Sequence, residues 1–228
     1  MAFSGGLAVS MLLLLTQLAS CAMPCVEQEK ASLLEFLSDL TRDGGLAVAG
    51  LEGHISPALG DLARLQRLNL SYNSLSGGLP LWQLVSSSQV VDVSFNRLNG
   101  ELGELPSSVT HGHPLQFNKF SGNIPSALGN CSMLKVLMLG HNNLSSTIPD
   151  ELFNSSTSLE RLSFRNAGLR GTLDSAHVTK LTDLVALDLG ENSFTSKIPE
   201  SIGQLKRLEE LLLDNNKMSG ELPPGVQV

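Results

Sequence analysis

The sequence predicts an α/β fold in which one short structural unit is repeated along the chain. Leucine dominates a chain of 228 residues that holds only eight Phe, one Tyr and one Trp, so a single aliphatic residue fills most interior positions. Within a constant apolar frame, a turn residue that is usually Asn returns every 22 to 25 residues, at positions 73, 96, 118, 142, 167, 192 and 216. A repeat of this period predicts a solenoid whose units stack and share one core.

Each unit follows the pattern L-x-x-L-x-L-x-x-N-x-L, which is the leucine-rich repeat. The best copies span residues 65–75, 134–144, 184–194 and 208–218. The L-x-L pair alternates with a period of two, so its leucines point inward from a short strand while the intervening side chains face solvent. Stacked copies predict a horseshoe solenoid with a parallel sheet on its concave side and irregular or 3-10 structure on its convex side.

The asparagine of each repeat is expected to close the turn that follows the strand. Its amide both donates and accepts, so it satisfies backbone groups that would otherwise be buried without partners in neighbouring turns. Ala167 occupies this position in one copy. We therefore expect a loosened turn at Ala167 and a gain in thermal stability from Ala167→Asn.

A glycine and a proline follow the asparagine in the segment L-x-G-x-I/L-P, as in residues 75–80, 120–125 and 218–223. Glycine permits backbone angles or close approaches that a Cβ forbids, and proline fixes φ where no ladder donor is needed. This segment is expected to turn the chain onto the convex side. Ser146 and Ser196 replace the glycine in two copies.

The first 22 residues are predicted to be a secretory signal peptide. Residues 7–18 form a short apolar stretch, and Ser20-Cys21-Ala22 offers small residues for cleavage after Ala22. Residues 18–21 also resemble a bacterial lipoprotein cleavage box, which is the alternative. Since no other run of about 18 apolar residues occurs, we expect no membrane span in the mature chain and an extracellular location in the apoplast, with any cell-surface association made through a partner. Cys25 and Cys131 are expected to stay unpaired.

Composition and motifs exclude several classes of function. A net charge of −7 and a pI near 5.2 disfavour nucleic-acid binding, because no dense Lys/Arg cluster is present. His111 and His113 lack acidic or cysteine partners at metal-ligand spacing and are interpreted as an exposed loop pair. No nucleophile elbow, phosphate-binding loop or kinase motif occurs. We therefore predict no enzyme activity, no cofactor and no metal site.

The repeats resemble the plant-specific leucine-rich-repeat class found in receptor-like kinases, receptor-like proteins and polygalacturonase-inhibiting proteins. The opening residues 25–36, the run Leu-Asn-Leu-Ser-Tyr-Asn-Ser-Leu-Ser-Gly at 68–77, and residues 92–96 and 201–208 are similar to receptors for tyrosine-sulfated peptides and phytosulfokine. The resemblance implies a helical N-terminal cap over residues 23–48, followed by a solenoid of about seven repeats over residues 49–228.

The chain also departs from this family. The cysteine-rich segment C-C-x-W-x-G-V-x-C that should follow the first helix is missing, so the cap is partial. The copy at residues 109–117 is abbreviated, with His113 where a strand leucine belongs. No terminal cap, island domain or kinase follows the last repeat, and the chain resembles a truncated relative.

The solvent-facing strand positions form the predicted binding surface, because repeat proteins use their extended concave face for recognition. Arg161 and Arg165, beside acidic neighbours on the next two strands, are candidates to hold a peptide carboxylate or sulfate next to a basic segment. The alternative is that these are solvated surface charges. The candidate ligand-binding residues are Arg67, Asp92, Met138, His141, Arg161, Ser163, Arg165, Asp188, Glu191, Glu210 and Asp214.

Four N-x-S/T sequons predict glycosylation, at Asn69, Asn130, Asn143 and Asn154. A glycan on Asn69 would cover part of the concave face. The leading hypothesis is an extracellular module that binds a peptide or protein in receptor-type signalling or defence perception, with a membrane receptor kinase as a further candidate partner. The alternatives are an inhibitor of a secreted cell-wall-degrading enzyme and a non-functional remnant of a longer receptor.

Overall fold

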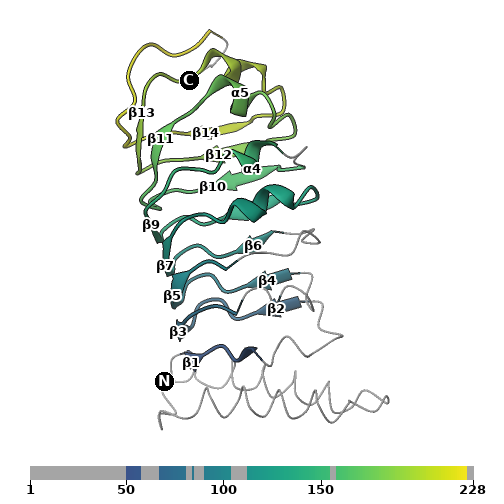
Figure 1. Ribbon diagram of the computed structural model, residues 1–228, viewed down its shortest axis with the longest axis vertical. Coiled ribbons are helices and arrows are strands. Elements are labelled where there is room, and N and C mark those ends of the chain that lie inside the picture. The colour runs from purple at the N-terminus through teal and green to yellow at the C-terminus, as the bar shows by residue number, and fades with distance from the viewer. Residues whose placement is uncertain are drawn as a thin grey trace, which may run out of the picture.

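The computed structural model describes residues 50–57, 67–80, 84, 90–103, 112–154 and 158–224. These residues form a single column of stacked coils, from β1 at one end to β14 at the other (Figure 1). The predicted signal peptide, the partial cap, Cys25 and His111 lie outside the described residues. No helix among the described residues is long and apolar enough to cross a membrane.

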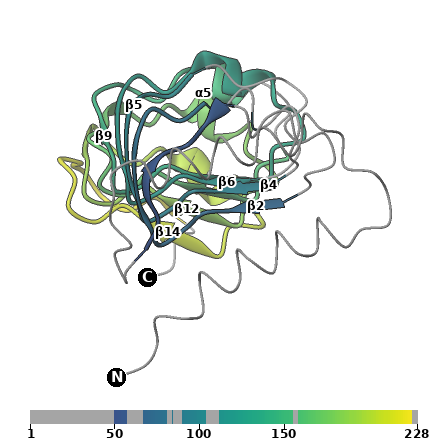
Figure 2. The same ribbon diagram turned by 90° about the horizontal axis from the view of Figure 1, so that it is seen from below.

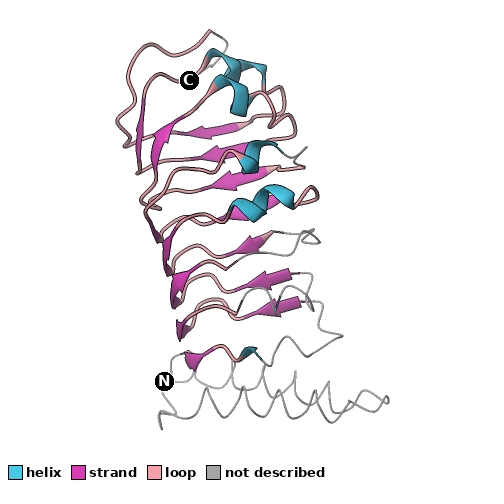
Figure 3. Ribbon diagram, in the orientation of Figure 1, coloured by secondary structure: helices cyan, strands magenta, loops and turns pink. Residues whose placement is uncertain are grey.

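Short parallel strands, one from each coil, build the predicted sheet, here called the concave sheet (Figure 3). Five of them pair in the order β14-β12-β10-β8-β6, and β2 pairs with β4. The β4 coil joins the larger group through a backbone bond of 3.2 Å from Val93 N to Pro114 O. The strands are β2 (Arg67–Asn69), β4 (Val90–Asp92), β6 (His113–Pro114), β8 (Val136–Met138), β10 (Arg161–Ser163), β12 (Ala186–Asp188) and β14 (Glu210–Leu212).

A second parallel sheet, which the sequence analysis did not predict, runs along a neighbouring side of the column. The segment after each turn asparagine forms these strands before it turns away, and glycines such as Gly77 (φ 79°) and Gly122 (φ 77°) end them in the left-handed region. Ser196 adopts the same conformation with φ 74°. The strands are β1 (Glu52–His54), β3 (Ser74–Gly77), β5 (Arg97–Glu101), β7 (Lys119–Gly122) and β9 (Asn143–Leu144), with a separate pair of β11 (Arg170–Thr172) and β13 (Ser193–Thr195).

Short helices cover the side of the column opposite the concave sheet, as seen along the stack (Figure 2). Two are 3-10 helices, η2 (Ser126–Asn130) and η3 (Glu200–Gln204), and each follows a proline of the repeat. Among the residues that the structure describes, α4 (Glu151–Asn154) and α5 (Ser175–Val178) are single α-turns. The predicted 3-10 structure on the convex side is confirmed.

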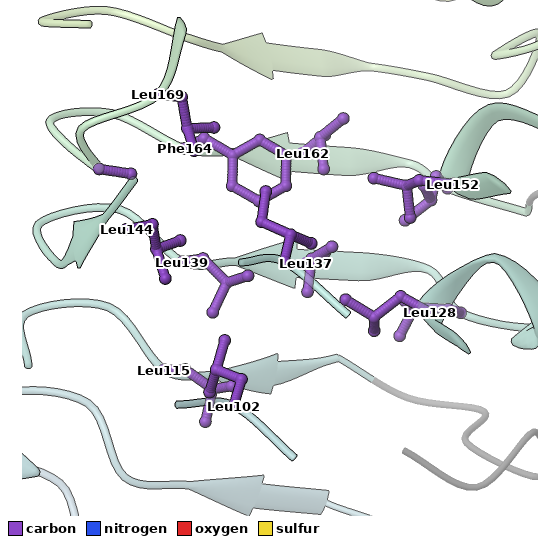
Figure 4. Close-up of a cluster of buried hydrophobic side chains, with 14 of the residues drawn as sticks. Leu102, Leu115, Leu128, Leu137, Leu139, Leu144, Leu152, Leu162, Phe164 and Leu169 are labelled. Atoms are coloured by element: carbon purple, nitrogen blue, oxygen red, sulfur yellow. The ribbon is translucent and has the colours of Figure 1, made fainter. Parts of the chain in front are cut away.

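The core is one continuous stack of inward-pointing leucines and phenylalanines (Figure 4). Leu137 of β8 pairs in register with Leu162 of β10, which pairs with Leu187 of β12. All three side chains are buried. His113 lies in strand β6, in register with Leu137, so the part of the prediction that placed it in a loop was wrong.

The turn asparagines form the predicted ladder of hydrogen bonds between coils. Asn142 accepts from Phe120 N of the preceding coil at 3.0 Å and donates to Leu115 O of that same coil at 3.1 Å. It also donates to Leu139 O of its own coil at 2.9 Å. Equivalent bonds are made by Asn73, Asn96, Asn118, Asn192 and Asn216.

The coil that carries Ala167 is remodelled. Gly168 takes a left-handed φ of 78° and packs so closely on the Leu144 carbonyl that a Cβ would collide with it. Ala167 N donates to Asn192 Oδ1 at 3.2 Å, and the turn keeps its backbone bond from Asn166 N to Gly190 O at 2.9 Å. The turn is therefore held and not simply loosened, but the second sheet is interrupted here, between β9 and β11.

Candidate ligand-binding surface

The predicted site residues lie on the concave sheet or in the turns that directly follow its strands. Arg67 begins β2, Asp92 ends β4 and Met138 ends β8. On β10, Arg161 is exposed and Ser163 is half-buried, while Asp188 ends β12 and Glu210 begins β14. His141, Arg165, Glu191 and Asp214 lie in the turns. The strand pairing thus brings all of these residues onto one face, spread along the stack.

Arg165 is the centre of an ion-pair network that spans three coils. Its Nη2 lies 2.7 Å from Asp214 Oδ2 and 2.8 Å from Glu191 Oε1, and its Nη1 lies 2.9 Å from Asp214 Oδ1 and 3.5 Å from Asp188 Oδ1. The hydrogen bonds that Arg165 donates, first to Asp214 and then to Glu191, raise the pKa of Arg165. The hydrogen bond from Arg165 in turn lowers the pKa of Asp214. The guanidinium is therefore held by both of its hydrogen-bonding edges.

A glycine makes this network possible. Gly190 lies beneath the guanidinium, and a Cβ at this position would collide with Arg165 Nη1 and come within 2.7 Å of Asp214 Oδ1. The Gly-x-Asn sequence of this turn, 190–192, therefore has a side-chain packing role that the repeat pattern alone did not reveal.

The network changes the interpretation of the two arginines. Arg165 donates to Asp214 and Glu191 already, so it does not present a free fork to a ligand anion. Between β10 and the turn after β14, the predicted site residues include four carboxylates and two guanidinium groups, an excess of two negative charges. The geometry does not support joint binding of a carboxylate or sulfate by Arg161 and Arg165, and this part of the surface favours a cationic ligand group.

An aromatic ladder stands at the turn edge of the concave sheet. The ring centroids of Tyr72 and Phe95 are 4.2 Å apart, those of Phe95 and Phe117 are 4.2 Å apart, and those of Phe117 and His141 are 4.0 Å apart. The rings are almost parallel, with interplanar angles of 9° to 13°. Asn166 Nδ2 continues the row at 3.3 Å from His141 Nδ1.

The backbone of the repeat creates this row. Each residue directly before the turn asparagine, or before Ala167, has a left-handed φ between 48° and 57°. This conformation costs about 1–2 kcal/mol for a residue with a Cβ, and it aligns the side chains of successive coils. Sequence reasoning selected only His141 and Glu191 from the row. The signal that could have found the others was the aromatic residue before the asparagine at Tyr72, Phe95 and Phe117.

The predicted glycosylation sites differ in their surroundings. Asn69 is exposed on β2, and its Oδ1 accepts from Ser71 Oγ at 2.7 Å, so the two functional residues of that sequon are already hydrogen-bonded. Asn130 is exposed at the end of η2 and Asn143 is exposed on β9. Asn154 ends α4. Only Asn69 lies on the concave sheet, and glycosylation at all four stays a prediction.

The described residues outside this surface include two cavities and a buried thiol. No group of three or more His, Cys, Asp or Glu side chains among them is placed to hold a metal ion. Cavities of about 360 and 270 Å³ lie away from the concave sheet, and the smaller is lined by Phe153, His177 and Arg170 among others. Cys131 is buried, and this burial raises the pKa of its thiol.

The parallel strands and the asparagine ladder identify the chain as a member of the leucine-rich-repeat family, and its concave face carries charged and aromatic side chains. The Leucine Rich Repeat family profile matches residues 64–83, 133–155, 183–205 and 207–228. The chain is similar to Receptor-like protein 54 of Arabidopsis thaliana, with 32% identity over 211 residues that cover 82% of this chain and 26% of that protein. It is also similar to Phytosulfokine receptor 1 of the same plant, with 35% identity over 46% of this chain and 13% of the receptor.

Solved structures show the same relationship. The ectodomain of the Arabidopsis receptor kinase HAESA, in complex with an extended IDA peptide hormone, superposes with a TM-score of 0.69 at 34% identity and covers 77% of this chain and 30% of that one. The PEPR1–AtPEP1 complex superposes with a TM-score of 0.67 at 30% identity over 75% of this chain and 24% of that one. The chain spans less than a third of the length of each of these proteins.

Proposed function

We propose that this chain is an extracellular recognition module that binds a peptide or protein along its concave sheet, in receptor-type signalling or defence perception. The main support is one observation: the coils present exposed and half-buried side chains of varied chemistry on a parallel sheet braced by the asparagine ladder. A rigid, preformed surface lowers the entropic cost of holding an extended ligand.

The similar proteins support the same function. The receptor kinase HAESA has been solved in complex with the peptide hormone IDA and the co-receptor SERK1. We infer by analogy that the present chain takes a peptide, and that a membrane receptor kinase is a candidate second partner. We expect secretion through the predicted signal at residues 1–22. We also expect no catalytic activity, because the Asp, Ser and His residues of the chain recur as parts of repeats.

A pair of matched substitutions tests the proposal. Arg161 is exposed on β10 of the concave sheet, and Arg170 is exposed on β11 of the second sheet. Arg161→Glu and Arg170→Glu make the same chemical change on the two faces. The wild-type protein is first used to capture its ligand from extracellular fluid, and the affinity of each variant for that ligand is then measured by calorimetry.

We expect Arg161→Glu to change the affinity about tenfold or more, which corresponds to about 1.4 kcal/mol, and Arg170→Glu to leave it unchanged. Equal affinities for the wild-type protein and Arg161→Glu, together with a loss in Arg170→Glu, would move the binding surface to the second sheet. Failure of the wild-type protein to capture any ligand would remove the support for a recognition function.

A further inference from the structure

The aromatic ladder offers ring edges to a ligand. The two faces of Phe95 are covered by Tyr72 and Phe117, and the two faces of Phe117 by Phe95 and His141. Exposure is nevertheless high, at 71% for Tyr72 and 39% for Phe117. Ring edges carry the positive end of the aromatic quadrupole, so they favour edge-to-face contact with another aromatic ring over flat stacking of a planar ligand.

Gln116 adds an unused hydrogen-bonding group beside this ladder. It lies between Leu115 and Phe117 in the turn after β6, and its Oε1 is shielded from solvent without a hydrogen-bond partner among the described residues. Such atoms are uncommon in folded proteins. A rotation of the half-buried side chain would let this oxygen accept from the backbone N–H of an extended peptide.

The row changes character farther along the stack. Beyond His141 it continues through Asn166 to Glu191, which together with Asp214 and Asp188 surrounds Arg165. Three carboxylates around one guanidinium leave a net negative charge at this end. An extended ligand that follows the row therefore meets apolar ring edges first and then a site that attracts a cation.

On this basis we propose that the row selects an extended peptide segment with an aromatic side chain against Tyr72–Phe117 and a Lys or Arg side chain at Glu191–Asp214. The proposal rests on the proposed function and specifies its ligand class. Neighbouring strands are about 4.8 Å apart, so Phe117 and Glu191 are separated by about 14 Å and Phe117 and Asp214 by about 19 Å along the stack.

The geometry also specifies the spacing of the two anchors in the ligand. An extended chain advances about 3.3 Å per residue, so these separations correspond to four and six residues, in either chain direction. Side chains of an extended segment alternate between two faces, so an even separation places both anchors toward the sheet. An odd separation places one of them toward solvent.

A phage-displayed library of random twelve-residue peptides tests the proposal on the full chain. We expect selection on the wild-type protein to enrich peptides with an aromatic residue and a Lys or Arg four or six positions apart. Phe117→Ala, which removes the ring from which these spacings are measured, should lower the affinity of these peptides about tenfold, as expected for an aromatic anchor at an interface. Enrichment of acidic peptides, or of pairs without a preferred spacing, would overturn the proposal.

A variant that removes two negative charges, called the charge-neutral variant, makes the test sharper. Glu191→Gln combined with Asp214→Asn leaves Arg165 without its two main partners, so selection on this variant should lose the basic anchor and gain acidic residues. Asp183→Asn is the control. The Asp183 carboxylate is exposed, forms an ion pair of 2.9 Å with Arg207 and lies away from the row. Thermal melts establish that each variant is folded.

The outcomes separate the two proposals. A natural ligand whose binding depends on Arg161, together with library peptides that ignore the row, would leave the recognition function standing and refute this ligand class. It would also be refuted if the wild-type protein and the charge-neutral variant selected the same peptides equally well.

Discussion

The asparagine ladder makes a quantitative prediction at Asn142. The side chain accepts one hydrogen bond, from Phe120 N, and donates three, to Leu115 O, Leu139 O and Gly140 O, at distances of 2.9 to 3.2 Å. In Asn142→Ala the amide of the fully buried Phe120 loses this acceptor. An unsatisfied buried donor costs about 1–3 kcal/mol, and each lost hydrogen bond about 1 kcal/mol net.

These contributions overlap, and we expect Asn142→Ala to lower the free energy of unfolding by about 3 kcal/mol. For a chain of this size, that loss corresponds to a fall in Tm of about 6–12 °C. Urea unfolding followed by circular dichroism, together with a thermal melt, measures both quantities.

The adjacent residue supplies the control. Asn143 is exposed on β9, so Asn143→Ala should change stability by less than about 0.5 kcal/mol. Both variants are made in unglycosylated protein, because Asn143 belongs to a sequon. If Asn142→Ala and Asn143→Ala melted at the same temperature, the ladder would not be the main link between coils.

Three further predictions follow from the remodelled coil and the Arg165 network. Ala167→Asn should lower Tm, against the expectation from sequence, because Ala167 is fully buried and the adjacent Gly168 packs closely on Leu144 O, which leaves little room for a longer side chain. A rise in Tm would show that the ladder can be completed. Gly168→Ala should lower the free energy of unfolding, measured in urea, by about 2–4 kcal/mol, because the left-handed φ and the collision with Leu144 O both oppose a Cβ. The control Gly103→Ala places its Cβ in open space and should leave stability unchanged. Similar losses in both variants would contradict this account. Asp214 has a lowered pKa in the folded protein, so the stability that it contributes is complete above the unfolded Asp value of about 3.9 and is lost as the pH falls through the lower folded value. Wild-type protein should therefore exceed Asp214→Asn in urea midpoint at pH 7, and the gap should close in acid; a gap that does not depend on pH would rule out this pairing as its source.

Much of the fold follows from the sequence because the repeat encodes it locally. The L-x-L pair sets the strand and its inward face, and the asparagine sets the turn, so the positions of β8, β10, β12 and β14 could all be predicted. The second sheet could not. Its strands are two to five residues long and carry no strict alternation, so only the stacking of neighbouring coils makes them pair.

The organisation of the concave face was harder to predict, for physical reasons. The partners of Arg165 lie 23 to 49 residues away in sequence, and their contacts depend on side-chain rotamers and on the absence of a Cβ at Gly190. The aromatic ladder depends on a left-handed turn residue, which no propensity favours for Tyr or Phe. At the coil that lacks the asparagine, Ala167 is followed by a left-handed backbone at Gly168, which the repeat pattern also did not predict.

Site-specific photo-crosslinking tests most directly whether the concave sheet is the binding surface. A benzoyl-phenylalanine is placed either at Met138, which is half-buried on β8 of the concave sheet, or at Thr172, which is exposed on β11 of the second sheet. After irradiation with the captured ligand, we predict one discrete crosslinked product from position 138 and none from position 172. Crosslinking only from position 172, or equally from both, would contradict the assignment of the concave sheet as the recognition surface.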